Sequence, residues 1–573
     1  MKRIVLLLCL LSALVYCKAE TIFEVDNLYY SLNDDNTVTL VAAPEEDDKY
    51  EGDIVIPSTV KYKGKNYSVT EIGESAFAFC VGLHSVIIPN SVTEIGKEAF
   101  FWCSELEKVR ISYSCKTIEG QAFLGCSSLI SIKIPDTVTS IEQGVFDMCQ
   151  ALCDINVDTN NPVYASADGI VYSKNLDTLV YCPPGKVGSV KIPDSVKSIG
   201  DYAFRGCLGL TSVNIPISVT SIEDGVFFYC GGLTSIEIPN SVTSIGENAF
   251  CYCSGLTNIK IPNSVTSIGD GAFYGCNGMT SIEIPNSVIS IGDLAFAECW
   301  SLPSITIPES ITTIRYCTFQ GCSDLTSIYI PNSVTTIESF AFEGCSALTH
   351  VEIPNSVREI QCFAFTRCEG LTSVEIPKFV MSIEEGAFSQ CTSLRNINVD
   401  KNNPTYASYD GILYTKNIGT LLCFPAGNTG SVKIPTFITS IGDDAFYGCS
   451  GLTKVDIPNS VTSIGGGAFC YCTGLKSIQI PNSVTYIGEF AFDGCSALAH
   501  VEIPNSVTEI GDCTFRDCTD LKKVEIPGSV TSIGQNAFKG CISLKSATIP
   551  KRFMSRKDDI FEYCPSLKKI KAF

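Results

Sequence analysis

The sequence is poor in the residues that most often carry catalysis. Its 573 residues include three histidines, two tryptophans and five methionines, and only 18% are charged. The histidines, His84, His350 and His500, stand at positions expected to face outward on strands. A catalytic triad needs neighbours in one fixed geometry, which a repeated sequence does not single out. Phosphate loops, paired metal motifs and EF-hand loops are also missing. We therefore expect no enzyme, no metal site and no cofactor.

Basic residues are scarce relative to acidic ones. The chain has 40 Lys and Arg against 61 Asp and Glu, a formal net charge of −21. Nucleic acids and anionic lipids bind to basic surfaces. The composition therefore excludes nucleic acid as a partner and favours a basic or neutral one.

Long apolar runs are missing after the first residues. Ile4 to Tyr16 is apolar over 13 residues and follows Lys2 and Arg3. This run is too short to span a bilayer and is typical of a secretory signal, with residues 1–19 as the expected signal peptide. The alternative is a lipoprotein with Cys17 as the lipidated residue. We expect a secreted or cell-surface protein, with association with an outer membrane as a further alternative, and no transmembrane span.

One sequence motif is repeated along most of the chain. "NSVTSIGENAFCYCSGLTNIKIP" at residues 240–262 returns at once as "NSVTSIGDGAFYGCNGMTSIEIP". Prolines recur every 23 residues from Pro216 to Pro377 and again from Pro435 to Pro550. A period in the twenties around "LxxIxI" is typical of leucine-rich-repeat solenoids. We expect about twenty turns stacked about 4.8 Å apart in a curved right-handed rod on the order of 100 Å long.

Each repeat divides into three pieces. "LTNIKIP" predicts a short strand with Leu256 and Ile259 inward, ended by Pro262. "VTSIG" predicts a second extended piece. "GAFYGC" predicts a compact turn or a short helix that buries Phe273 and Cys276. One repeat cannot bury these residues alone, so the stack supplies the core.

A cysteine recurs in nineteen repeats, each time three residues after a phenylalanine. These ladder cysteines are Cys80 to Cys149, Cys207 to Cys391 and Cys449 to Cys564, in steps of 23. Metal binding needs converging ligands, and a ladder offers one thiol per turn. Disulfides between neighbouring turns are within geometric reach, but an odd number would pair irregularly. We favour the third interpretation, that cysteine acts here as a small buried hydrophobe.

Two islands and an end segment depart from the repeat. Residues 155–185 and 397–427 have nearly the same sequence. Within it, "GIVYSKNLDTLVYCP" predicts a β-hairpin that could protrude and bind a partner. Residues 20–68 predict a β cap and first turn that cover the open end. Residues 69–573 then form a β-rich leucine-rich-repeat solenoid.

The consensus "IPxSVTxIGxxAFxxCxxLTSIxIP" resembles the BspA-like leucine-rich repeats, also known as Treponema pallidum-type repeats and widespread in Bacteroidetes. The resemblance covers Ile54 to the C-terminus, islands included. It implies secreted or surface adhesion proteins, with host matrix proteins among their partners, and no catalytic residues. This chain shows no Ig-like module or C-terminal sorting signal of the kind found in larger members.

The remaining candidate site is a surface. The central outward position of the strands turns acidic along the chain, and we take as the candidate binding face Glu237, Glu283, Tyr329, Glu352 and Glu375. A row of carboxylates with an aromatic anchor attracts a partner. We therefore expect a binding or adhesion protein whose partner is a protein, such as a host matrix or neighbouring-cell protein, or a glycan. The alternative is a structural surface or matrix component without a specific ligand.

Overall fold

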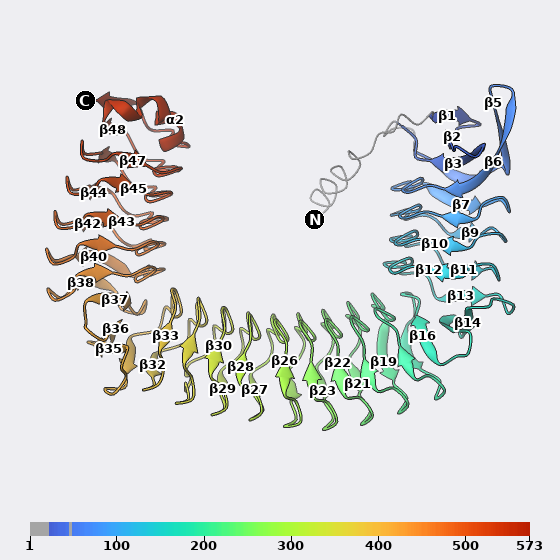
Figure 1. The fold of residues 1–573 in the computed structure, drawn as a ribbon, viewed down its shortest axis with the longest axis horizontal. Helices are drawn as coiled ribbons and strands as arrows, with labels where there is room; N and C mark the ends of the chain where they lie inside the picture. Colours follow the sequence, from blue (N-terminus) through green and yellow to red (C-terminus); the bar gives the residue numbers. More distant parts are fainter. Residues whose placement is uncertain (1–21, 45–48) are drawn as a thin grey trace. The chain divides into compact units, whose positions relative to one another are not determined.

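The computed structural model describes residues 22–44 and 49–573 (Figure 1). The chain divides into two compact units, Met1–Ser241 and Val242–Phe573, which are described separately. The expected signal peptide, residues 1–19, and Cys17 lie outside the described residues.

The first unit begins with strands that differ from the repeat. β1 (Ile22–Val25), β2 (Leu28–Leu32) and β3 (Thr37–Val41) form an antiparallel meander, and β5 (Thr59–Tyr62) pairs with β6 (Lys65–Ile72) as a hairpin. β3 then pairs in parallel with β6, which continues into the repeats. Tyr30, Val38 and Leu40 are fully buried beneath this cap. The β cap expected from the sequence is therefore present.

The "LxxIxI" segments of each unit follow one another as a first parallel ladder, which is divided into several sheets. In β23, Ile259 is buried between the exposed Asn258 and Lys260, and Asn258 pairs with Ser281 of the next turn. Pro262 ends the strand, and its carbonyl accepts the Val265 N–H at 3.0 Å to close the turn. The strands of this ladder in the first unit are β4 (Gly52–Val55), β7 (Leu83–Ile87), β9 (Lys108–Arg110), β11 (Ser131–Ile134), β13 (Asp154–Val157), β17 (Gly188–Lys191), β19 (Leu210–Asn214) and β21 (Ser235–Glu237). Those in the second unit are β23 (Asn258–Lys260), β25 (Ser281–Glu283), β27 (Ser304–Thr306), β29 (Ser327–Tyr329), β32 (Ser373–Ile376), β34 (Asn396–Val399), β38 (Gly430–Lys433), β40 (Leu452–Asp456), β42 (Ser477–Gln479), β44 (His500–Glu502), β46 (Lys523–Glu525), β48 (Ser546–Ile549) and β49 (Lys569–Ala572).

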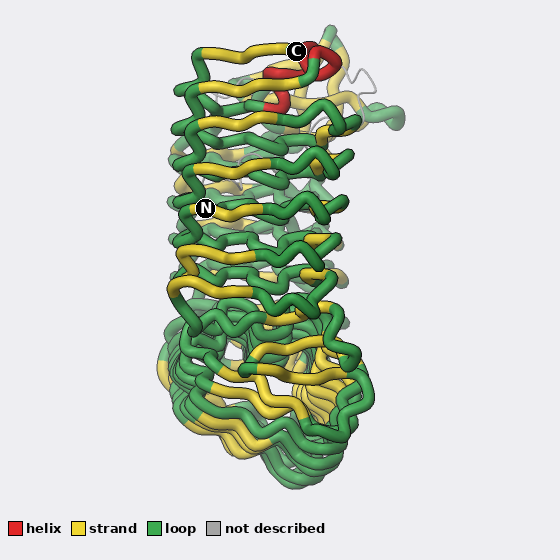
Figure 2. Tube along the Cα trace, turned by 90° about the vertical axis from the view of Figure 1, so that its left-hand side faces the viewer, coloured by secondary structure: helices red, strands yellow, loops and turns green. Residues whose placement is uncertain are grey.

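The "VTSIG" segments form a second parallel ladder of two-residue strands. Figure 2 shows the strands of successive turns lying in tiers, joined by turns. Side chains reinforce this ladder, since the Thr266 hydroxyl donates to the Thr243 carbonyl at 3.2 Å. Its strands are β8 (Glu94–Ile95), β10 (Thr117–Ile118), β12 (Ser140–Ile141), β18 (Ser198–Ile199) and β20 (Ser221–Ile222) in the first unit, and β22 (Ser244–Ile245), β24 (Ser267–Ile268), β26 (Ser290–Ile291), β28 (Thr313–Ile314), β30 (Thr336–Ile337), β31 (Glu359–Ile360), β33 (Ser382–Ile383), β39 (Ser440–Ile441), β41 (Ser463–Ile464), β43 (Tyr486–Ile487), β45 (Glu509–Ile510) and β47 (Ser532–Ile533) in the second.

The "GxAFxxC" segment is a turn and not the short helix that the sequence also allowed. Gly271 and Gly275 flank Phe273 with φ of 58° and 68°, so the chain is left-handed on both sides of the ring, which interrupts any helix. The Phe273 N–H donates to the Ala295 carbonyl of the next turn at 2.8 Å. These turns therefore form a third hydrogen-bonded ladder along the stack.

The core is a column of phenylalanine rings beside a column of thiols. Phe273 and Phe296 stack 5.4 Å apart with planes 3° from parallel. Cys276 has no exposed surface, and its thiol donates to the Phe250 carbonyl of the preceding turn at 3.1 Å. Cys299 and Cys322 repeat this contact at 3.2 Å each. Both are free thiols, as the packing interpretation predicts, but the thiol is also a hydrogen-bond donor.

Each island contains the predicted hairpin, extended by a third strand. In the second unit β35 (Tyr406–Tyr409), β36 (Ile412–Thr415) and β37 (Thr420–Cys423) form an antiparallel meander, and β37 then pairs in parallel with β39. In the first unit β14 (Tyr164–Ala167), β15 (Ile170–Ser173) and β16 (Thr178–Tyr181) do the same, with β16 joined to β18. The predicted hairpins are therefore present, and their last strands continue the second ladder, since Leu421 pairs with Ile441 as repeat isoleucines do.

The C-terminal end is covered by the only helical residues in the described part of the chain. A 3₁₀-helix, η1 (Lys551–Arg556), runs into α2 (Lys557–Ile560), and β49 pairs with β48. Phe553 and Ile560 are buried against the last turns. Neither described helix has the length and apolar character to cross a bilayer.

Candidate binding site

The predicted acidic face is exposed strand surface. Glu283, Tyr329 and Glu375 are exposed on strands of the first ladder in the second unit, Glu352 is exposed at the equivalent position of a turn that forms no strand there, and Glu237 is exposed at the end of β21 in the first unit.

Two of these residues are hydrogen-bonded within the second unit. The Tyr329 hydroxyl donates to Glu309 Oε1 at 3.1 Å, and this hydrogen bond raises the pKa of Tyr329. Asn398 Nδ2 donates to Glu375 Oε1 at 2.7 Å. Lys260 pairs in register with Glu283, so a cation lies beside that carboxylate. The face is therefore less uniformly acidic than the sequence row implied.

A notch lies at the outer turns on either side of the second island. In an ordinary repeat, Ala-Phe is followed by the loop that leads to the ladder cysteine. In the island, Phe424 keeps the ladder contact, its N–H donating to the Ala445 carbonyl at 2.7 Å. The chain then turns back at once, and Gly427 N–H donates to the Leu394 carbonyl at 2.8 Å. The outer loop of this one turn is therefore missing.

The missing loop brings the turns on either side together. Gly448 stands directly against Gln390, so that a Cβ at position 448 would lie 2.3 Å from Gln390 Cγ. Gly448 also has a φ of 71°, and only glycine combines this conformation with so close an approach. A pocket of about 620 Å³ opens here, between the outer turns that end at Cys345, Cys368 and Cys391 and those that end at Cys449 and Cys472.

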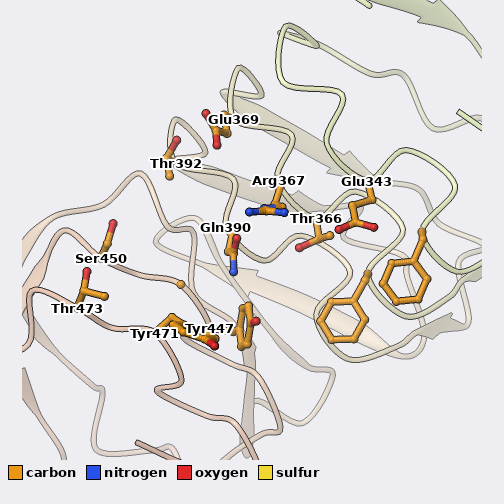
Figure 3. A pocket seen from close by; sticks show the side chains of 13 residues that line it. Glu343, Thr366, Arg367, Glu369, Gln390, Thr392, Tyr447, Ser450, Tyr471 and Thr473 are labelled. Atoms are coloured by element: carbon orange, nitrogen blue, oxygen red, sulfur yellow. The ribbon is translucent and has the colours of Figure 1, made fainter. Parts of the chain in front are cut away.

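The floor of the notch is aromatic (Figure 3). Phe340 and Phe363 stack at 5.4 Å, with planes 14° from parallel. Phe363 meets Tyr447 edge-on at 6.3 Å, and Tyr447 meets Tyr471 edge-on at 5.7 Å. Burial raises the pKa of Tyr447 to about 12, so its hydroxyl remains a hydrogen-bond donor at neutral pH. Four rings thus form a continuous row across the junction.

The walls of the notch are polar. In Figure 3, hydroxyl, carboxylate, amide and guanidinium groups surround the opening above the rings. They belong to Glu343, Thr366, Arg367, Glu369, Gln390, Thr392, Ser450 and Thr473. Glu343 accepts a hydrogen bond from Gln320 Nε2 at 2.7 Å, and the buried Thr366 hydroxyl donates to the Ser389 carbonyl at 3.0 Å.

Two planar side chains at the notch keep their polar groups available. Within the described residues, the Arg367 guanidinium forms no ion pair or side-chain hydrogen bond, and neither does the Gln390 amide. Arg367 is exposed, and its positive charge lowers the pKa of Tyr447 against the larger effect of burial. These groups offer several donors and an acceptor toward the pocket.

A smaller acidic cavity of about 200 Å³ lies in the same unit, between β33 and the island. It is lined by Glu384, Glu385, Asp443 and Asp444. Burial, followed by the charges of Glu385 and Asp443, raises the pKa of Asp444 to about 7. Searching the described residues finds no group of three or more side chains placed to hold a metal ion.

Sequence reasoning missed the notch. The island sequence predicts only its hairpin. The sequence signal for the notch lies in the flanking repeats, where aromatic residues occupy turn positions that hold small or polar residues in many other repeats. Phe340 and Phe363 stand where Gly271 and Gly467 stand in their own turns, two residues before the stacked phenylalanine. Only the loss of a loop in the island brings them within reach of Tyr447.

The sequence profile of the BspA type leucine rich repeat region (6 copies) matches residues 60–177, 180–300, 289–410 and 439–568. Among solved structures, a leucine rich cell surface protein of Faecalibacterium prausnitzii A2-165 is 22% identical, with 97% of this chain and 95% of that chain covered and a TM-score of 0.27. A leucine-rich repeat protein of Bacteroides ovatus is 24% identical over 96% of this chain and 99% of that chain, with a TM-score of 0.26. The Treponema pallidum leucine rich repeat protein is 24% identical over 49% of this chain and 91% of that chain, with a TM-score of 0.24. No curated protein matches the chain.

Proposed function

The chain belongs to the family of BspA-type leucine-rich repeat proteins, and from that premise we propose that it is a secreted or cell-surface binding protein without catalytic activity. Its repeats form a scaffold that presents one surface to a protein or glycan partner. The apolar run at Ile4 to Tyr16 supports export.

The observation that carries the proposal is the notch beside the second island. A regular stack repeats the same surface at every turn and offers no unique place for a ligand. The island breaks that regularity once in the second unit, at the point where Phe340, Phe363, Tyr447 and Tyr471 meet. Binding sites are concave, mostly aromatic or apolar, and fixed by a few polar groups. The notch is concave and has an aromatic floor, and it carries more polar lining residues than is usual.

Binding is tested with the full mature chain immobilised as bait for host-cell and neighbouring-cell surface extracts. The notch variant carries Arg367→Ala and Tyr471→Ala, which change exposed side chains. The strand-face variant carries glutamine at positions 237, 283, 352 and 375 together with Tyr329→Ala. We expect the parent and the strand-face variant to capture the same partner and the notch variant to lose it.

Two results would count against the proposal. Loss of the partner by the strand-face variant alone would return the site to the acidic row. Capture of nothing by the parent, together with self-association, would favour a structural surface or matrix component. Cell fractionation checks the location, and recovery of the protein only from the cytoplasm would contradict export.

A further inference from the structure

We propose that the notch binds a neutral carbohydrate, with a pyranose ring packed on the exposed ring of Tyr471 beside Tyr447 and hydroxyl groups held by Arg367 and Gln390. This inference rests on the proposed binding function and names its ligand class. Nothing in the repeat pattern requires a sugar, so the argument comes from the chemistry of the lining.

The floor suits the apolar face of a sugar. Aromatic rings carry a negative face, toward which the weakly positive C–H groups of a pyranose point. Tyr471 is 45% exposed, so its ring is open to a ligand, and Tyr447 lies half-buried beside it at 5.7 Å. The tyrosine hydroxyls add polar contacts at the edge of the same surface.

The walls suit hydroxyl groups. Arg367 supplies a planar fork of donors, and Gln390 supplies an amide with two donors and one acceptor. Both side chains lack a partner among the described residues, so no existing hydrogen bond or ion pair has to be broken when a ligand binds. Glu343 and Glu369 supply acceptors. Sugar hydroxyls, which donate and accept, match such a mixed set.

The composition of the lining favours a sugar over a peptide. None of the thirteen lining residues is leucine, isoleucine, valine or methionine, whereas peptide sites hold pockets for apolar side chains. Two carboxylates face one guanidinium, and the whole chain carries a net charge of −21, so sulfated and other polyanionic glycans are disfavoured. A volume of about 620 Å³ falls within the usual range for small-ligand sites of about 300–1,000 Å³.

The first island provides a contrast within the same chain. It has the same short return, with the Gly185 N–H donating to the Leu152 carbonyl at 2.8 Å. There, however, Arg205 takes the position that Tyr447 holds in the second unit, directly after the stacked phenylalanine. Its guanidinium pairs with Asp147 at 3.0 Å and covers the Tyr202 ring. Its polar group is satisfied internally, so we assign carbohydrate binding to the second island alone.

The test is binding of the full mature chain to an array of neutral, sialylated and sulfated oligosaccharides, followed by calorimetry with the best neutral oligosaccharide. Arg367→Ala and Tyr471→Ala should each weaken binding about tenfold or more, the usual effect of losing a charge-assisted hydrogen bond or an aromatic anchor. Tyr471→Phe keeps the ring and should retain most of the affinity.

Tyr229→Ala is the matched control. Tyr229 is the second residue after a stacked phenylalanine, as Tyr471 is, and is 47% exposed, but it lies in the first unit. Its replacement should leave binding unchanged. Circular dichroism and melting curves confirm that each variant is folded.

The outcomes separate this inference from the proposed function. If an oligosaccharide binds but both notch variants bind it as the parent does, the notch is not its site. If no oligosaccharide binds while the notch variant still loses a captured protein, the carbohydrate assignment is wrong and the binding function stands. If neither oligosaccharides nor extracts yield a partner, both are overturned.

Discussion

At the scale of single residues, the ladder cysteine combines two properties that the position requires. It is small and apolar, so it fits beside the stacked rings, and its thiol donates to a carbonyl that the turn leaves in the core. Cys276 meets the Phe250 carbonyl at 3.1 Å, and Cys299 meets the Phe273 carbonyl at 3.2 Å. A valine or leucine would not donate, and each carbonyl would then keep only its backbone hydrogen bond, such as that from the Cys253 N–H to the Phe250 carbonyl at 3.1 Å. The sequence alone predicted the packing but not the hydrogen bond, because the acceptor belongs to the preceding turn.

Replacing Cys276 tests this donor. Cys276→Ala removes one of two hydrogen bonds to the Phe250 carbonyl, which keeps the Cys253 N–H at 3.1 Å, so the expected cost is about 0.5–1.5 kcal/mol. Cys276→Ser keeps a donor on the same side chain, so its cost should be smaller. The melting temperatures of the two variants and the parent give the order of their stabilities. Cys153→Ala, at an exposed cysteine, serves as the control and should melt like the parent. A serine variant less stable than the alanine variant would contradict the donor role.

Thiol reactivity follows from the same burial. Burial raises the pKa of Cys276 far above its ordinary value and that of Cys322 to about 12, so neither forms the reactive thiolate near neutral pH. We expect an alkylating reagent to label the exposed Cys153 in the native protein and the ladder cysteines only after denaturation. Mass spectrometry of labelled peptides makes the comparison. Disulfides joining neighbouring ladder cysteines would show that the stack is cross-linked and not packed.

At the scale of elements, the islands exchange one outer loop for a meander. Asn403 anchors this exchange, since it is fully buried and its amide donates to the carbonyls of Pro377 and Val380 at 2.9 and 3.0 Å. The hairpin was predictable from alternating apolar residues around a polar turn. The lost loop was not, because "CFPAG" contains the ladder phenylalanine and looks like part of a repeat until its return to Leu394 is seen.

Asp444 beside the second island should make this region sensitive to pH. Its carboxyl has a pKa of about 7 in the folded chain against 3.8 as its ordinary value. As the pH rises from about 4 to 7, the unfolded chain loses this proton first, so stability falls over that interval. Asp444→Asn removes this loss. Asparagine also tolerates the φ of 51° at this position.

Melting curves at two pH values provide the measurement. Parent and Asp444→Asn should melt alike near pH 4.5, and the variant should be more stable near pH 7.5, by on the order of 1–3 kcal/mol. Glu385→Gln removes a charge that raises this pKa and should reduce the same pH dependence. If the difference in stability between the parent and Asp444→Asn were the same at both pH values, Asp444 would be ionised in the folded chain at both.

At the scale of the whole molecule, repetition made most of the fold predictable and the site unpredictable. The inward positions of one repeat, such as Leu256, Ile259 and Phe273, are buried in the structure as the sequence indicated, because the same pattern of apolar residues recurs in every repeat. The acidic row was found in the same way, by reading one position along the stack. The notch depends on residues such as Phe340 and Tyr471 that lie more than a hundred positions apart and meet only where a turn is cut short.

The most direct test of the account is hydrogen–deuterium exchange of the full mature chain with and without the neutral oligosaccharide that binds best on the array. Exchange of backbone amides reports where a ligand restricts local opening. We expect slower exchange in peptides covering residues 340–343, 363–369, 390–392, 447–450 and 471–473, with no change around the first island or on β25, β29 and β32. Protection of those strands, or no protection anywhere at saturating oligosaccharide, would contradict the assignment of binding to the notch.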